Sequence, residues 1–251
     1  MIFEKRKKGT KRELLFLGKK FFSYSKFDKD KWCEKILKLE QELEYIKNWQ
    51  TDFFKDIPEK FPLIMSEKER NLLIKHIKLS QKHIEFGAGG SSFLALLYSD
   101  AVVYSVESNK NWIDYIQSWK FIRDKERENK ISFNIIDIGQ TGDWGYPVNN
   151  SNETDYPKYS LSIFEKLKDT HVDTIFIDGR FRVACALASI LYCPYAKILM
   201  HDYTIRKEYH VIEEFLDICE VADTLTVFSL KKNFNQLRVK ELYEKYKYVT
   251  Q

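Results

Sequence analysis

The sequence predicts an α/β fold built on a mainly parallel sheet, and three features support this prediction. The chain has 251 residues, 44% hydrophobic and 31% charged, which is enough for one α/β domain with a smaller extension. From about residue 83 onward, short apolar runs alternate with longer amphipathic ones, as in βαβ units. A glycine-rich segment at residues 87–90 lies where the first apolar run gives way to a helical pattern.

Residues 1–60 are predicted to extend a main domain of residues 61–251. The leader, residues 1–20, carries eight Lys or Arg against two Glu. We expect a solvated arm with a short hairpin, making at most a peripheral contact with anionic lipid. Residues 28–49 have apolar positions at helical spacing, which predicts an amphipathic helix and leaves a homodimer through it open.

The elements of the larger domain follow in order along the chain. Ser66 and Glu69 form a capping box ahead of a helical pattern at residues 72–77. Strands are predicted at residues 83–86, 101–107, 131–137, 174–178 and 197–202. Helices are predicted at about residues 92–98, 111–127, 183–191, 208–219 and 237–246, with closing edge strands within residues 221–230. Residues 139–160 show no periodicity, and loops of this length are often functional lids.

Composition argues against several classes of protein. The four cysteines are scattered without a CxxC pair, so neither a disulfide framework nor a zinc site is expected. The chain shows no apolar run long enough for a bilayer and no signal-peptide pattern, so a cytoplasmic location is expected. The net charge of +4 comes from intermixed signs, and no nucleic-acid partner is predicted.

The glycine-rich corner is the most informative segment. Glycine at a strand-to-helix corner allows unusual dihedrals and lets the main chain approach a ligand. Dinucleotide sites favour G-x-G-x-x-G, but the third glycine position here is Ser92, and the acidic Glu85 precedes the corner. A carboxylate at that position disfavours a pyrophosphate, and therefore a nicotinamide oxidoreductase, but suits the ammonium group of a methionine moiety. The residues expected to bind a cofactor with such a methionine moiety are Glu85, Gly87, Ala88, Gly89, Ser91 and Ser92.

Acids at the next two strand ends extend this pattern. Glu107, twenty residues beyond Gly87, can accept hydrogen bonds from both hydroxyls of a ribose. Asp137, or the amide after it, can meet an adenine edge. Glu85-Phe86-Gly87-Ala88-Gly89, Glu107 and Asp137 together resemble the motifs of class I S-adenosylmethionine-dependent methyltransferases over about residues 61–231. The resemblance implies a Rossmann-like, mainly parallel seven-stranded sheet with helices on both faces.

The fourth and fifth predicted strands end in candidate catalytic residues. They are Asp178 on one strand and His201 with Asp202 on the other. His201 is the natural general base by its ordinary pKa, Asp178 can serve instead, and Asp178 with Asp202 can hold a divalent cation. The pattern resembles small-molecule and sugar O-methyltransferases, which implies Mg²⁺ bound by the matching acids. The His-Asp pair departs from that ligand set and leaves the metal open.

The remaining candidates concern the methyl acceptor. Arg180 and Arg182 suit a carboxylate or phosphate, or could pair with Asp178 or Glu107. We also expect Tyr203 to contact the acceptor. Residues 142–147 offer aromatic faces for stacking or form a packed loop.

The sequence therefore predicts O-methylation of a sugar or other small polar acceptor. The leader segment at residues 11–24 looks like leaders on bacterial capsule and lipooligosaccharide assembly enzymes, which suggests surface polysaccharide. A nicotinamide-dependent oxidoreductase and a non-catalytic Rossmann-like binding protein are the alternatives.

Overall fold

The computed structural model describes residues 3–8, 11–16, 19–25, 36, 38–39, 57–168 and 170–250. The chain divides into two compact units, Met1–Phe54 and Lys55–Gln251. The division expected near residue 60 stays a prediction. Among the described residues, no helix has the length and apolar character needed to cross a membrane.

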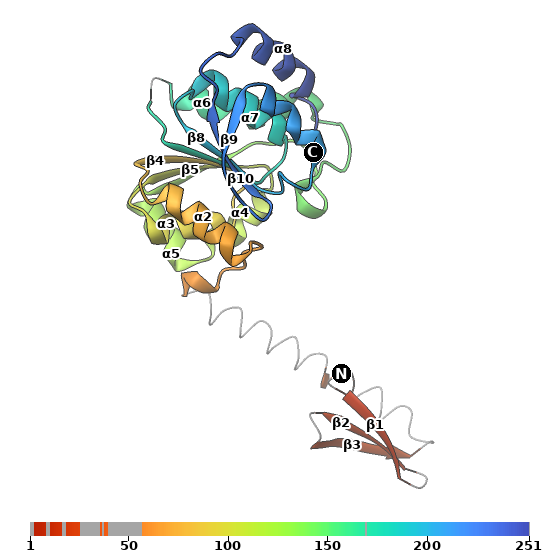
Figure 1. Ribbon diagram of the computed structural model, residues 1–251. Helices are drawn as coiled ribbons and strands as arrows, with labels where there is room; N and C mark the ends of the chain where they lie inside the picture. The colour runs from red at the N-terminus through yellow and green to blue at the C-terminus, as the bar shows by residue number, and fades with distance from the viewer. Residues whose placement is uncertain are drawn as a thin grey trace. The chain divides into compact units, whose positions relative to one another are not determined.

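The first unit contains a three-stranded antiparallel sheet in the order β1-β2-β3 (Figure 1). Its strands are β1 Phe3–Lys8, β2 Lys11–Phe16 and β3 Lys19–Ser25. The expectation of an arm with a single hairpin was therefore too simple: two residues separate consecutive strands, which suits two successive hairpins. The amphipathic helix predicted at residues 28–49 lies outside the described residues, except for three helical positions at 36, 38 and 39.

The second unit is built on a seven-stranded sheet in the order β6-β5-β4-β7-β8-β10-β9. The first five strands in this order are parallel, and β10 is antiparallel to both of its neighbours. This confirms the predicted fold class. The strands are β4 Lys82–Phe86, β5 Val102–Glu107, β6 Ile131–Ile135, β7 Thr174–Ile177, β8 Lys197–Met200, β9 Leu216–Ala222 and β10 Leu225–Leu230.

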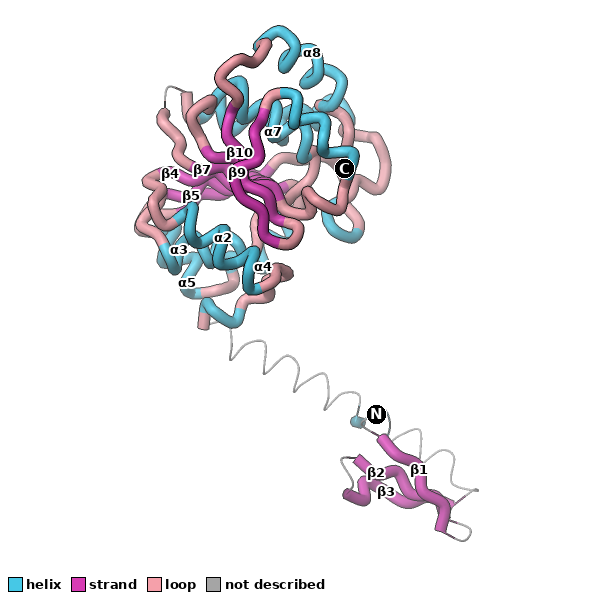
Figure 2. The backbone as a smooth tube through the Cα atoms, viewed as in Figure 1, coloured by secondary structure: helices cyan, strands magenta, loops and turns pink. Residues whose placement is uncertain are grey.

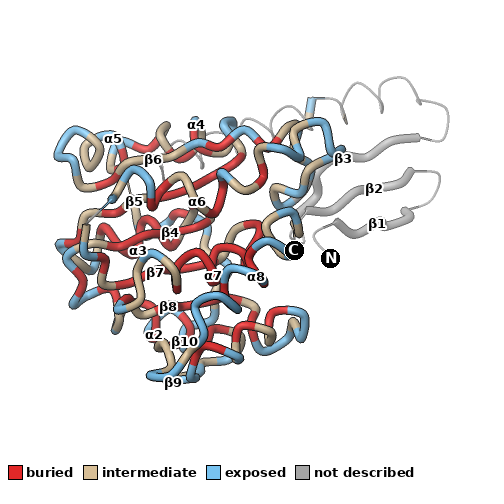
Figure 3. The backbone as a smooth tube through the Cα atoms, turned by 90° about the horizontal axis from the view of Figure 1, so that it is seen from above, coloured by how far each residue is buried: buried red, intermediate tan, exposed pale blue. Residues whose placement is uncertain are grey.

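Helices cover both faces of this sheet (Figures 1 and 2). On one face lie α2 Glu67–Ile77, α3 Gly90–Tyr98, α4 Lys110–Gln117 and α5 Lys120–Arg127. On the other lie α6 Tyr156–Lys166, α7 Arg182–Tyr192 and α8 Gln236–Tyr246. The short 3-10 helices are Pro58–Lys60, Asp143–Gly145, Glu153–Asp155 and Lys207–Glu214. Figure 3 shows the central strands buried between these layers, where two hydrophobic clusters form the core.

Two helix predictions need correction. The single helix expected at residues 111–127 is broken between α4 and α5, because Trp119 is extended and buries its ring against Phe61 and Phe93. The helix expected at residues 208–219 is a 3-10 helix followed by β9. Pairing of β9 with β10, through a turn with Asp223 at φ +48°, overrides the apparent helical periodicity.

Two other local predictions have different outcomes. The Ser66 side chain accepts from the Glu69 amide, and the Glu69 side chain accepts from the Ser66 amide, so the capping box is confirmed. The long loop expected at residues 139–160 is shorter than predicted. Its last part forms the first turn of α6, which buries Tyr156 and Tyr159.

Candidate active site

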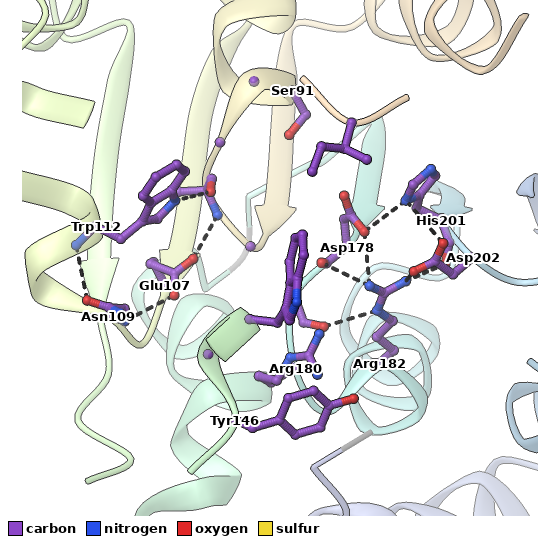
Figure 4. A pocket seen from close by; sticks show the side chains of 18 of the residues that line it. Ser91, Glu107, Asn109, Trp112, Tyr146, Asp178, Arg180, Arg182, His201 and Asp202 are labelled. Atoms are coloured by element: carbon purple, nitrogen blue, oxygen red, sulfur yellow. Dashed lines mark hydrogen bonds and ion pairs between the residues drawn. The ribbon is translucent and has the colours of Figure 1, made fainter. Parts of the chain in front are cut away.

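A cavity of about 620 Å³ lies at the carboxyl ends of β4, β5, β7 and β8. Ligands bind at this edge of doubly wound sheets because the connecting loops diverge there. Figure 4 shows its side chains converging from both halves of the sheet. Ten residues singled out from the sequence line it: Gly87, Ala88, Gly89, Ser91, Glu107, Asp178, Arg180, Arg182, His201 and Asp202.

The glycines of the β4–α3 corner have different roles. Gly87 has φ +98°, and a Cβ on it would lie 2.6 Å from the Gly179 nitrogen. A Cβ on Gly90 would lie 2.7 Å from the Pro62 carbonyl oxygen. A Cβ on Gly89 would meet nothing within 4 Å. Gly87 and Gly90 therefore allow close backbone packing, whereas Gly89 leaves open space beside the cavity.

Glu107 is fixed by the backbone around it. Its Oε2 accepts from the Ala88 amide at 3.1 Å, and its Oε1 accepts from the Ser108 and Asn109 amides at 2.7 and 3.0 Å. Burial raises the pKa of Glu107, although these amides oppose the rise. Because Oε2 accepts a single hydrogen bond from the described residues, it can still accept one from a ligand hydroxyl.

Glu85 does not face the cavity, contrary to the expectation of a direct cofactor contact. It is fully buried and accepts hydrogen bonds from the hydroxyls of Ser91, Ser92 and Ser105. Burial raises its pKa to about 7 against the effect of these donors. Ser92 is likewise fully buried and lies outside the lining. Glu85 therefore fastens the start of α3 to β4 and β5.

Two other expected contacts also lie outside the lining. Asp137 is exposed, and its Oδ1 accepts from the Gly139 amide at 2.8 Å, which holds a local turn. Tyr203 is buried, and its hydroxyl donates to Glu213 at 2.6 Å. β6 ends at Ile135, two residues earlier than predicted, so Asp137 lies in the turn that follows the strand.

Arg182 is a structural link between two strand ends. Its Nε donates to Gly179 O at 3.0 Å, Nη1 contacts His201 O and Asp202 Oδ2, and Nη2 contacts Asp178 O and Oδ1. Three of these contacts are hydrogen bonds to carbonyl oxygens, and two are ion pairs with carboxylates. The alternative that Arg182 pairs with Asp178 is therefore the one observed.

His201 lies between carboxylates. Its Nδ1 is 3.1 Å from Asp178 Oδ1, and its Nε2 is 3.5 Å from Glu69 Oε2. Burial lowers the pKa of His201, but its hydrogen bond to Asp178 and the charges of Asp178, Asp202 and Glu69 raise it more. The surrounding carboxylates therefore stabilise the imidazolium form, and His201 Nδ1 is already engaged with Asp178. This geometry favours Asp178 over His201 as the general base.

Glu69 makes a second set of contacts that the sequence did not reveal. Beyond capping α2, it accepts hydrogen bonds from the amide and hydroxyl of Thr224 at 2.8 and 2.5 Å. Burial raises the pKa of Glu69, but the hydrogen bonds from Thr224 and Ser66 outweigh it and lower that pKa to about 2. Glu69 therefore stays ionised beside His201.

Asp178, His201 and Asp202 each present a ligand atom within 4.8 Å of the others, the spacing of a metal site. Arg182 nevertheless contacts both carboxylates, at 3.0 and 3.2 Å, and His201 Nδ1 shares Asp178 Oδ1 with it. Magnesium prefers an octahedron of oxygen ligands and keeps several waters. The residues present do not fit Mg²⁺ as arranged, because a buried guanidinium already pairs with both carboxylates and the third group is a histidine.

Several lining residues were not singled out from the sequence. Trp112 donates from Nε1 to Ala88 O at 2.7 Å, and Asn109 caps α4 by accepting from the Trp112 amide (Figure 4). Arg206 and residues 62–64 reach the cavity from other segments. The Asn109 cap was recognisable by residue type; the others depend on tertiary packing. From the expected aromatic loop, Trp144 and Tyr146 line the cavity, and Trp144 is 75% exposed with φ +58°.

Solved structures provide the comparison with known proteins. No protein-family model and no curated protein sequence matches the chain. A methyltransferase-like protein from Silicibacter pomeroyi matches at 28% identity and a TM-score of 0.67, covering 77% of this chain and 100% of that one. A methyltransferase from Geobacter sulfurreducens matches at 14% identity and a TM-score of 0.43, covering 76% of this chain and 87% of that one. The O-methyltransferase TomG from Streptomyces achromogenes, in complex with SAM, matches at 12% identity and a TM-score of 0.46, covering 67% of this chain and 82% of that one.

The fold matches that of class I S-adenosylmethionine-dependent methyltransferases, and the cavity lies at the edge of the sheet where such folds bind their ligands. Within that class, the chain is similar to the methyltransferase-like protein from Silicibacter pomeroyi over the whole of that protein.

Proposed function

We propose that this protein transfers a methyl group from S-adenosylmethionine to a hydroxyl oxygen of a small polar acceptor, with a sugar as the expected acceptor class. The observation that carries this proposal is the continuity of the cavity, which runs from the Gly87–Gly89 corner and Glu107 to Asp178. Donor and acceptor can therefore lie side by side in one continuous space, as an in-line displacement requires.

The cofactor end is assigned to the corner and to Glu107. S-adenosylmethionine supplies a methyl group on a positively charged sulfur. The free acceptor position on Glu107 Oε2 suits a ribose hydroxyl, and the open space beside Gly89 lets a ligand approach the main chain. Trp112 lines the same end and offers an aromatic face.

The acceptor end is assigned to Asp178. Its Oδ1 is held by Arg182 and His201, whereas its Oδ2 accepts no hydrogen bond from the described residues. This oxygen can take the proton of an acceptor hydroxyl while the hydroxyl oxygen forms its bond to the methyl carbon and the carbon–sulfur bond breaks. The products are a methyl ether, the neutral thioether and protonated Asp178. His201 and Arg182 are positioning residues, which hold the carboxylate at a fixed angle.

The proposed reaction does not use a metal, because Arg182 already bridges Asp178 and Asp202. The cytoplasmic location, the homodimer, the absence of a nucleic-acid partner and the peripheral membrane contact stay predictions. The role in capsule or lipooligosaccharide assembly also stays a prediction, supported by the sequence of the leader alone.

The test compares two variants that each remove one carboxylate from Arg182. Asp178→Asn should keep the wild-type affinity for S-adenosylhomocysteine in calorimetry and lower methyl transfer to a panel of sugars by about 10²–10⁴-fold. Asp202→Asn controls for the lost ion pair and should lower transfer far less. Equal activity of Asp178→Asn and wild type would remove Asp178 from the chemistry. Binding of NAD without binding of S-adenosylhomocysteine would favour an oxidoreductase.

A further inference from the structure

Two arginines two positions apart have opposite environments. Arg182 is held by three hydrogen bonds and two ion pairs at the strand ends. Arg180 is also buried, at 7% exposure, yet its Nε and Nη1 are buried without a hydrogen-bond partner among the described residues. No carboxylate of the described residues lies within ion-pair distance of Arg180. A buried charge without a partner is costly, so a ligand that supplies one is expected.

Arg180 belongs to a positively charged wall of the cavity. Its guanidinium lies 4.0 Å from the centre of the Tyr146 ring (Figure 4). Arg206 lines the same cavity, and its Nε also lacks a hydrogen-bond partner, with Asp202 Oδ2 at 3.9 Å from Nε and Glu208 Oε1 at 4.0 Å from Nη1. Burial raises the pKa of Tyr146, but the charges of Arg180 and Arg206 and side-chain hydrogen bonds with both arginines outweigh it and lower that pKa.

The acids of the cavity do not pair with Arg180. Glu107 is held by backbone amides, Asp178 and Asp202 pair with Arg182, and Asp202 also lies 3.9 Å from Arg206. Of the two arginines in the wall, Arg180 is therefore the one without an ion-pair partner among the described residues. A carboxylate or phosphate matches two guanidinium groups through charge-assisted hydrogen bonds.

We infer that Arg180 and Arg206, together with Tyr146, form a subsite for an anionic oxygen group of the methyl acceptor. This inference rests on the proposed function and narrows its acceptor to a sugar acid, a sugar phosphate or another small anion. The methionine carboxylate of the cofactor has the same chemistry. We favour the acceptor over the cofactor carboxylate as the ligand of this subsite because of the positions of the two arginines. Both follow β7 and β8, the strands that carry Asp178 and Asp202, rather than β4 and β5, which carry the cofactor end.

The Tyr146 ring lies over the Arg180 guanidinium, whose Nε and Nη1 atoms are buried. The inference therefore includes a shift of the ring when a ligand binds these atoms. Tyr146 lies on a segment whose residue Gly145 has φ +76° and whose residue Trp144 has φ +58°. Backbone in this region is sparsely populated by residues other than glycine, which is common where a loop adjusts to a ligand.

The experiment titrates full-length protein, saturated with S-adenosylhomocysteine, with glucose 6-phosphate, glucuronate and glucose. We expect either anion to bind at least about tenfold more tightly than glucose. Arg180→Met should lower the anion affinity by about tenfold or more, leave the affinity for S-adenosylhomocysteine unchanged and raise the melting temperature, because it removes an unpaired buried charge. Arg127→Met, at a 76% exposed arginine of α5, is the matched control. Arg206→Met, at a partly exposed side chain, should also weaken anion binding.

Three results would overturn the inference. One is an anion affinity no higher than that of glucose, and another is unchanged anion binding in both arginine variants. The third is a loss of affinity confined to the cofactor. In that case Arg180→Met would weaken the binding of S-adenosylhomocysteine but not that of methylthioadenosine, which lacks the carboxylate. Failure of the proposed function has a different readout: the wild type would not bind S-adenosylhomocysteine. Phosphate binding to Arg180 can be measured separately, without any cofactor.

Discussion

The backbones of Gly87 and Gly179 lie against each other, so that a Cβ added to Gly87 would come within 2.6 Å of the Gly179 nitrogen. This contact joins the corner after β4 to the end of β7, which carries Asp178. The cofactor end and the catalytic end of the cavity are therefore positioned by one pair of glycines.

Gly87→Ala should destabilise the fold. The new methyl group would meet backbone atoms that cannot move independently, at a φ of +98° that residues with a side chain rarely adopt. Backbone strain of this kind costs about 1–3 kcal/mol, and the clash adds to it. Urea unfolding followed by circular dichroism measures the loss. An unchanged unfolding midpoint would show that the contact is looser than described.

Gly89→Val should have the opposite phenotype. A Cβ there meets nothing within 4 Å, so the free energy of unfolding should stay close to that of the wild type. The added methyl groups should occupy space beside the cavity and lower the affinity for S-adenosylhomocysteine, measured by calorimetry, by at least about tenfold. Wild-type affinity in Gly89→Val would mean that the ligand does not approach the main chain at this residue.

Arg182→Met should leave Asp178 and Asp202 without their shared cation. Removing one partner of a buried pair typically costs about 3–5 kcal/mol, and the lower end applies because both carboxylates keep some exposure. Chemical denaturation measures the effect, and Arg238→Met, at an exposed surface arginine, is the control in which little change is expected. Equal stability of the Arg182 variant and wild type would contradict its role as a link.

Glu85 should make stability depend on pH. Its pKa is raised from 4.5 to about 7, so the folded protein binds the proton more tightly than the unfolded chain. The resulting stabilisation is present below about pH 4.5 and is lost as pH rises through about 7. Relative to Glu85→Gln, the wild type should lose roughly 3 kcal/mol across this range. A difference in the free energy of unfolding between wild type and Glu85→Gln that does not change with pH would contradict this prediction. Glu165→Gln, at an exposed residue, is the control, for which no pH-dependent difference from the wild type is expected.

Magnesium should not bind the protein loaded with S-adenosylhomocysteine. Arg182 already pairs with both Asp178 and Asp202, so calorimetric titration to about 1 mM should show no saturable heat, and EDTA should not change methyl transfer. Saturable binding of Mg²⁺ that is lost in Asp178→Asn would require Arg182 to move and would restore the metal mechanism.

The sequence was sufficient for the sheet and for the corner. Short apolar runs ending in acids place Glu107, Asp178 and Asp202 at one edge, because parallel strands end on the same side of a sheet. It was also sufficient for the capping box of Ser66 and Glu69, since that motif depends on residues three apart.

Other features could not be predicted because they depend on contacts between distant segments. Glu85 was assigned to the cofactor because its position fits the motif, but the hydroxyl of Ser105 on the neighbouring strand helps to hold it in the interior. Arg180 and Arg182 look alike in sequence, and only the positions of β7 and β8 decide which one is paired. The helical pattern at residues 208–219 extends into β9, where pairing with β10 overrides it.

A crystal structure of the full-length protein with S-adenosylhomocysteine tests the central claim most directly. We predict density against the main chain of Gly87 and Gly89, with a ribose hydroxyl on Glu107 Oε2 and the sulfur facing Asp178. Density in another part of the molecule, or a ribose that does not contact Glu107, would contradict the account.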